Sequence, residues 1–255
     1  MIRLGARINL AMLCGVLCSA ALPLWVSSGQ ATYSPAPHCD VLFDNLMAGK
    51  TVRTAGILSP DGRYVSWSDT ELRKAPGLNR EELQSGRVVL RSRVSGSERA
   101  ILRTRLNSTG RVLWPDGKAD EFTNASAFCV VDWSPDSRYL LVIETIAELR
   151  SDVISEFYWV HDLRQQRARQ IPTKRLREAI AKAGTTTERV SREDIWLRVQ
   201  GFEQSHPSNI VFHAHDPHVR GFLGFWSIPV SGGPPRLLSE DESAVHTRPF
   251  GTLLR

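Results

Sequence analysis

Three histidines lie within six residues in the C-terminal quarter of the chain, and their spacing suits metal binding. His213 and His215 are separated by one residue, so a β-strand would place both imidazoles on one face, and His218 follows in a turn. Imidazoles arranged in this way can hold zinc. A metal-dependent hydrolase that uses His213, His215 and His218 is therefore one hypothesis for the function.

The residues around these histidines argue against a metal site. Asp216 directly follows the second histidine and should point to the opposite face of the strand, and Pro217 intervenes before His218. A zinc ion needs three or four ligands whose side chains are held by further hydrogen bonds, and no motif places another ligand here. We therefore expect no metal and no other cofactor.

Motifs of other enzyme classes are missing from the sequence. It contains no Gly-x-Ser-x-Gly elbow, no P-loop and no Gly-x-Gly-x-x-Gly run, so serine hydrolase chemistry and nucleotide binding have no support. Four carboxylates fall at predicted turns and strand ends, where acidic residues are common, and we interpret them as structural: Asp61, Asp69, Asp136 and Glu144. A binding protein is expected rather than an enzyme.

The N-terminal residues have the features of a secretory signal peptide. Arg3 and Arg7 precede an apolar run over residues 10–26, and small residues follow it, so we expect cleavage after residue 31, or earlier after Ala21, and export to the periplasm or the medium. The alternative is a membrane anchor through residues 10–26. No further membrane span is expected. Removal of the leader lowers the net charge from +5 to +3, and the basic residues form no stripe, so we expect no nucleic acid partner.

Two cysteines remain after the leader, Cys39 and Cys129. In an exported protein, the oxidising environment outside the cytoplasm would permit such a pair to form a disulfide. Cys129 lies in an apolar run, and we favour a buried free thiol at this position, with the disulfide as the alternative.

An internal repeat organises the rest of the chain. The run Leu58–Val65 and the run Trp133–Leu140 share the pattern Ser-Pro-Asp, then Gly or Ser, then an aromatic residue, which favours a tight hairpin between two strands. A degenerate copy follows at Ser205–Phe212, with a turn expected to be about two residues shorter. The three turn prolines are 75 and 72 residues apart, which indicates one repeated unit.

Each unit predicts four short strands, and the expected fold is all-β and β-propeller-like with about three blades. Residues 32–54 form an N-terminal segment, residues 55–240 the repeat domain and residues 241–255 a tail, with units at about 55–104, 128–172 and 193–239. An amphipathic helix is expected over residues 174–183. Five tryptophans are predicted to pack between blades: Trp67, Trp133, Trp159, Trp196 and Trp226.

Three blades are fewer than a closed ring needs. Three alternatives therefore stay open: a fourth blade built from residues 40–54, 103–127 and 241–255, an open stack of sheets, or oligomerisation across unpaired edges.

The repeat resembles the propeller repeats of the TolB family and of the non-catalytic domains of prolyl-oligopeptidase-type enzymes. The residues that carry this resemblance are Ser59-Pro60-Asp61-Gly62, Trp133-Ser134-Pro135-Asp136 and the run Phe225–Leu237. The resemblance implies a propeller without implying an activity, because propellers have many unrelated functions. It favours an exported, non-enzymatic binding or scaffold protein that recognises a protein or a cell-envelope component.

The leader generates a first prediction. The mature protein should begin between residues 22 and 32, because the small residues after the apolar run suit signal peptidase. N-terminal sequencing of the exported protein checks this. Recovery of the full-length chain from detergent-solubilised membranes alone would contradict it.

Overall fold

The computed structural model describes residues 51–74, 82–119, 123–148, 154–183, 195–216, 221–239 and 249–254. All of them belong to one compact unit, residues 33–255, and the predicted signal peptide lies outside the described residues. Among the described residues, no helix is long and apolar enough to cross a membrane.

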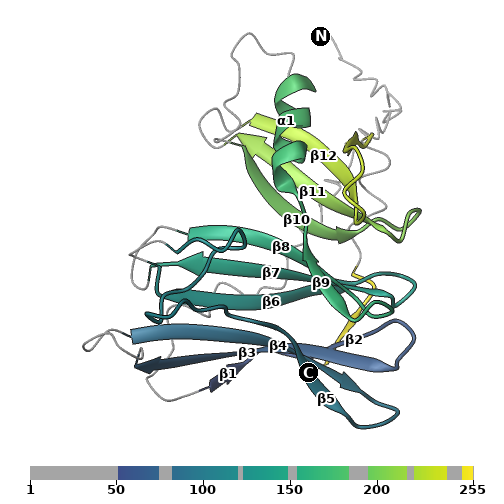
Figure 1. The fold of residues 1–255 in the computed structure, drawn as a ribbon. Coiled ribbons are helices and arrows are strands. Elements are labelled where there is room, and N and C mark those ends of the chain that lie inside the picture. Colours follow the sequence, from purple (N-terminus) through teal and green to yellow (C-terminus); the bar gives the residue numbers. More distant parts are fainter. Residues whose placement is uncertain are drawn as a thin grey trace, which may run out of the picture. The chain divides into compact units, whose positions relative to one another are not determined.

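The described strands form three antiparallel groups, which we call the first, second and third blades (Figure 1). The first comprises β2 (Ile57–Leu58), β3 (Tyr64–Lys74), β4 (Glu82–Ser92) and β5 (Glu98–Arg103), and β1 (Thr51–Arg53) also pairs with β3. The second comprises β6 (Ala125–Trp133), β7 (Tyr139–Ala147), β8 (Ile154–Asp162) and β9 (Arg167–Gln170). The third comprises β10 (Trp196–Phe202), β11 (Asn209–Asp216), β12 (Gly221–Pro229) and β13 (Arg236–Leu237).

These blades make the fold all-β and propeller-like, as the repeat predicts. Each blade is a meander in which consecutive strands pair. A single parallel pairing, Gln84 with Ala125, joins the first blade to the second.

The Ser-Pro-Asp motif forms the turn between β2 and β3 in the first blade and the turn between β6 and β7 in the second. In the second blade Ser134 Oγ donates to Asp136 Oδ1 (2.6 Å) and accepts from the backbone N–H of Tyr139 (2.8 Å). The first blade repeats both bonds, at 2.6 and 3.0 Å, with Ser59, Asp61 and Tyr64. The side chains therefore satisfy backbone groups that the reversing chain leaves without a partner.

The Gly or Ser that follows the aspartate adopts a left-handed conformation. The φ angle is 70° at Gly62 and 57° at Ser137. Glycine reaches this region without strain, whereas a serine there is uncommon. Ser137 also contacts the neighbouring blade, since its Oγ accepts from the backbone N–H of Asp61 (3.0 Å).

The third turn differs from the expected one. Glu203 N–H donates to the carbonyl of Asn209 (2.9 Å), in the position where Ser134 N–H donates to Tyr139. The turn is therefore one residue longer than the others, and the prediction of a shorter turn was wrong. Glu203 stands where the first two turns have serine, which the alignment on Ser205 and Pro207 missed.

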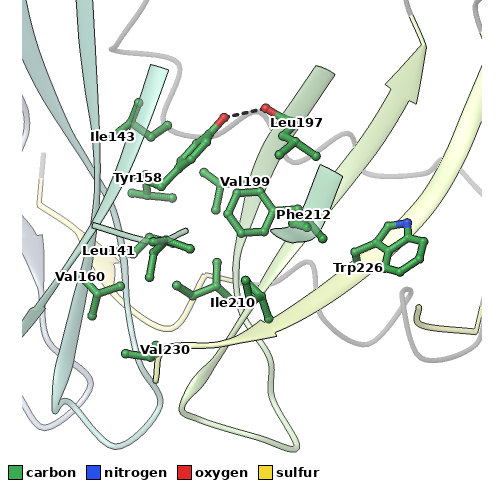
Figure 2. Close-up of a cluster of buried hydrophobic side chains, with 14 of the residues drawn as sticks. Leu141, Ile143, Tyr158, Val160, Leu197, Val199, Ile210, Phe212, Trp226 and Val230 are labelled. Atoms are coloured by element: carbon green, nitrogen blue, oxygen red, sulfur yellow. Dashed lines mark hydrogen bonds between the residues drawn. The ribbon is translucent and has the colours of Figure 1, made fainter. Parts of the chain in front are cut away.

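Two large hydrophobic cores hold the blades together, and the second blade contributes to both; a third, small cluster contains Leu83, Val112 and Ile146. One core lies between the first and second blades and includes Trp133, which is fully buried, stacks on Tyr64 at 6.3 Å and donates from Nε1 to the carbonyl of Ile57 (3.0 Å). The other lies between the second and third blades, where Figure 2 shows Tyr158 donating to the carbonyl of Leu197 (2.6 Å).

Helix α1 (Thr173–Ala183) connects the second and third blades at nearly the predicted residues. Its buried residues, Leu176 and Ile180, are one turn apart and join the core between these blades. The helix therefore closes the end of this core against β12.

The described parts of the segments that were candidates for a fourth blade do not form one. Thr51–Arg53 pairs with β3, and β14 (Thr252–Leu253) pairs with β2, so both extend the first blade. In the segment 103–127, the described residues outside β5 and β6 form two isolated bridges, Leu106 with Val112 and Leu113 with Ala119.

Cys129 is 4% exposed and disulfide-bonded, which corrects our preference for a free thiol. Cys39 lies outside the described residues.

The turn chemistry yields a second prediction. Ser134→Ala should lower the free energy of unfolding by about 1–3 kcal/mol, because it leaves the buried N–H of Tyr139 without its acceptor. Urea denaturation measures this. Ser95→Ala, at an exposed turn, is the matched control and should change stability by less than about 0.5 kcal/mol. Equal effects of the two substitutions would contradict the structural role of the motif.

Candidate binding surface

One face of the third blade carries aromatic and histidine side chains that the core does not cover. The alternation of β10 and β11 directs Leu197, Val199 and Phe212 into the core between the second and third blades. The alternate residues of β10 and β11, together with two phenylalanines of β12, lie on the other face, which we call the aromatic–histidine face. Its members are Trp196, Arg198, His213, His215, Phe222 and Phe225. Trp196 is 60% exposed and Phe222 is 54% exposed.

The face consists of two rows that run across three strands. Trp196 is paired with His215 and His215 with Phe222, and the second row joins Arg198, His213 and Phe225 in the same order. A bulge between His213 and His215 shifts the register with β12, so both phenylalanines reach the same face.

The rings of this face contact one another. The ring centroids of Trp196 and His215 are 5.6 Å apart, and those of His213 and His215 are 5.7 Å apart. His213 also lies 5.2 Å from Phe222 and 5.3 Å from Phe225. These are distances of favourable aromatic contact, so the rings support each other as one surface.

One imidazole of the face is held in its neutral form. Burial, together with the nearby His215 and Arg198, lowers the pKa of His213, so its imidazole is neutral at pH 7. Nδ1 of His215 is buried and has no hydrogen-bond partner among the described residues. Arg198 contributes a guanidinium, and rings make up the other five side chains of the face. A partner would therefore meet mostly ring surface.

The structure brings His213 and His215 together but shows no metal centre in the part of the chain it describes. Among the described residues, no three His, Cys, Asp or Glu side chains are placed to hold a metal ion. Asp216 is 5% exposed, on the strand position that alternates away from His215. His218 lies outside the described residues, so the metal hypothesis stays a prediction.

The other end of the third blade is organised by the buried carboxylate of Glu203. It accepts from Arg236 (2.8 Å), from Asn209 (3.1 Å), from Ser205 (3.0 Å) and from Ser227, and lies 2.6 Å from Nδ1 of His206. Burial opposes ionisation, but the hydrogen bonds led by Ser227 and His206 outweigh it and lower the pKa of Glu203 to about 2. Glu203 is thus an ionised structural group.

The four carboxylates interpreted as structural have protein partners. Asp61 and Asp136 belong to the turns described above. Asp69 pairs with Arg53 (2.7 Å) and Arg87 (3.0 Å), whose hydrogen bonds outweigh burial and lower its pKa. Burial raises the pKa of Glu144, which accepts from Trp159 (2.8 Å) and Ser126 (3.1 Å).

Two of the five tryptophans are not where the sequence predicted them. Trp133 and Trp226 are buried in the cores between blades, and the partly buried Trp159 packs against the core that contains Trp133. Trp67 is buried but belongs to neither core, and Trp196 is exposed, so the prediction that these two pack between blades was wrong. Arg198, Phe222 and Phe225 were not predicted as surface residues. The alternation of Trp196 and Arg198 with apolar residues places both on the face of β10 opposite Leu197, but whether that face is covered depends on the neighbouring sheet.

Two solved structures have a distant structural likeness to this chain. A TolB from Acinetobacter baumannii has a TM-score of 0.23 and 10% identity over 74% of this chain and 43% of its own. A putative dipeptidyl aminopeptidase IV from Bacteroides ovatus has a TM-score of 0.24 and 9% identity over 75% of this chain and 35% of its own. No protein-family model and no curated protein sequence matches.

The chain thus spans less than half the length of either protein. At these TM-scores the likeness assigns neither a family nor an activity to this chain. The fold assignment is based on the blades themselves.

The Glu203 network yields a third prediction. Glu203→Gln should lower the free energy of unfolding at pH 7 by about 2 kcal/mol, because the ionised carboxylate accepts several charge-assisted bonds. A lowered pKa stabilises the fold above the ordinary value of 4.5, so the difference should shrink between pH 4.5 and about 2. Urea denaturation across this range checks it. Glu98→Gln, on an exposed side chain, is the control, and a difference that persists to pH 2 would contradict the assignment.

Proposed function

We propose that this chain is an exported, non-enzymatic binding or scaffold protein that contacts a protein or another cell-envelope component through its aromatic–histidine face. The observation that carries the proposal is the exposure of Trp196 and Phe222 on a sheet face whose other rings, His213, His215 and Phe225, pack against them.

The composition of the face fits a binding role. Trp, Phe and Arg are enriched at the centres of protein interfaces, and Trp and Arg are frequent among the residues that contribute most of the binding free energy. Large exposed apolar patches are uncommon on soluble monomers and often mark binding sites. The mutual contacts of the rings also reduce the side-chain entropy that binding would remove.

Two features of the sequence support the remaining parts of the proposal. The basic and apolar leader supports export. The turn motifs at Ser59 and Ser134, which resemble those of TolB-family propellers, support a scaffold that presents a surface rather than an active site.

A fourth prediction tests the binding face. Trp196→Ala combined with Phe222→Ala should reduce binding to the partner at least tenfold, because interface anchors contribute about 1–2 kcal/mol each. Cross-linking followed by affinity purification from envelope extracts identifies the partner, and titration of that purified partner measures the loss. Val94→Ala, which changes an apolar side chain that is 78% exposed on the first blade, is the control and should bind normally.

Equal binding by the double variant and the wild type would contradict the assignment of the face. About one zinc ion per purified chain, lost together with a hydrolase activity when His213 and His215 are replaced by Ala, would instead favour the metal-dependent alternative.

A further inference from the structure

Residues 249–254 form a strap that lies against two blades. Thr252 and Leu253 pair as β14 with Leu58 and Ile57 of the first blade, and Leu254 N–H donates to the carbonyl of Gly56 (2.8 Å). The strap therefore adds a strand to the first blade, next to β2.

The second blade holds the strap through one buried carboxylate. Asp132, which is 1% exposed, accepts from the backbone N–H groups of Phe250 (3.0 Å) and Gly251 (2.9 Å) as well as from Trp133 (2.8 Å). Burial raises the pKa of Asp132 to about 7 against the opposing effect of these three bonds, so the carboxylate is ionised at pH 8. A buried carboxylate is thus matched to the main chain of the strap.

Two side-chain positions of the strap are restricted. A Cβ atom at Gly251 would lie 2.9 Å from Trp133 Cδ1 and would overlap Ile57, so this position requires glycine. Phe250 packs against the core between the second and third blades. The next positions are open, since Leu253 is 44% exposed and Leu254 is 39% exposed.

These contacts suit an exchangeable strand. The hydrogen bonds involve the main chain of the strap, and main-chain pairing accepts other sequences that keep the aromatic–glycine pair. Apart from Phe250, the strap buries little apolar surface, so its own side chains add little to its affinity for the two blades.

We propose that the seat of the strap, formed by β2, Asp132 and Trp133, is a strand-addition site that also binds in trans an extended polypeptide segment carrying an aromatic–glycine pair. In the free protein the strap occupies the seat, and a partner segment displaces it. This site is separate from the aromatic–histidine face and does not rest on the function proposed for that face.

The test uses full-length chains and a fluorescein-labelled peptide of residues 246–255. In a Gly251→Val chain the new side chain clashes with Ile57 and Trp133, so the strap of this chain cannot occupy the seat and the seat is free. At pH 8 this variant should bind the peptide at least tenfold more tightly than the wild-type chain, whose own strap competes at an effective concentration in the millimolar range. Thr252→Val, at an exposed strap position, is the matched control and should behave as the wild type.

A peptide that carries the same Gly251→Val change should bind the variant chain at least tenfold more weakly. Equal binding of the two peptides, or no binding by a Gly251→Val chain with an unchanged circular dichroism spectrum, would overturn the proposal. If that variant does not fold, the wild-type chain labelled with ¹⁵N decides: excess unlabelled peptide should shift the amide signals of Phe250 and Gly251, and unshifted signals would refute exchange.

Discussion

The end of strand β6 is the point on which the arrangement of the blades depends. There Trp133 inserts its indole between the first and second blades and donates to the carbonyl of Ile57, while the neighbouring Asp132 binds the main chain of residues 250 and 251. Two consecutive residues thus fix the first blade, the second blade and the strap. The indole is fully buried with its N–H satisfied, and the carboxylate has three donors, so neither polar group is left without a partner.

The positions of the two cores determine which surfaces remain for binding. The second blade is covered on both sides, so its residues serve packing. In the first blade Arg53 covers Trp67, with its guanidinium 4.8 Å from the ring centroid, and neutralises Asp69. In the third blade, Trp196 and Phe222 are exposed, and no described residue covers them in this way. The two outer blades therefore differ, because one protects its ring with an ion pair and the other exposes its rings.

The turn between the first two strands of each blade has its backbone groups satisfied by side chains, and two different sets of side chains do this in the three blades. In the first two, a serine hydroxyl and an aspartate satisfy the reversing backbone. In the third, Glu203 replaces the serine and binds Arg236 and Ser227 from outside the turn as well as His206 within it. Motif comparison finds the first set, because its partners lie within five residues. It misplaces the second, since Ser227 and Arg236 lie 24 and 33 residues away in sequence.

The sequence by itself determined the repeated hairpins, the all-β class and the helix at residues 174–183, because these follow from local turn chemistry and from the period of apolar residues. Only the tertiary structure decided the destination of residues 252–253, the burial of Asp132 and the exposure of Trp196. Each of these depends on which blade lies opposite. A tryptophan on one face of a strand is a core residue if another sheet covers that face and a binding residue if none does, and no local pattern encodes that difference.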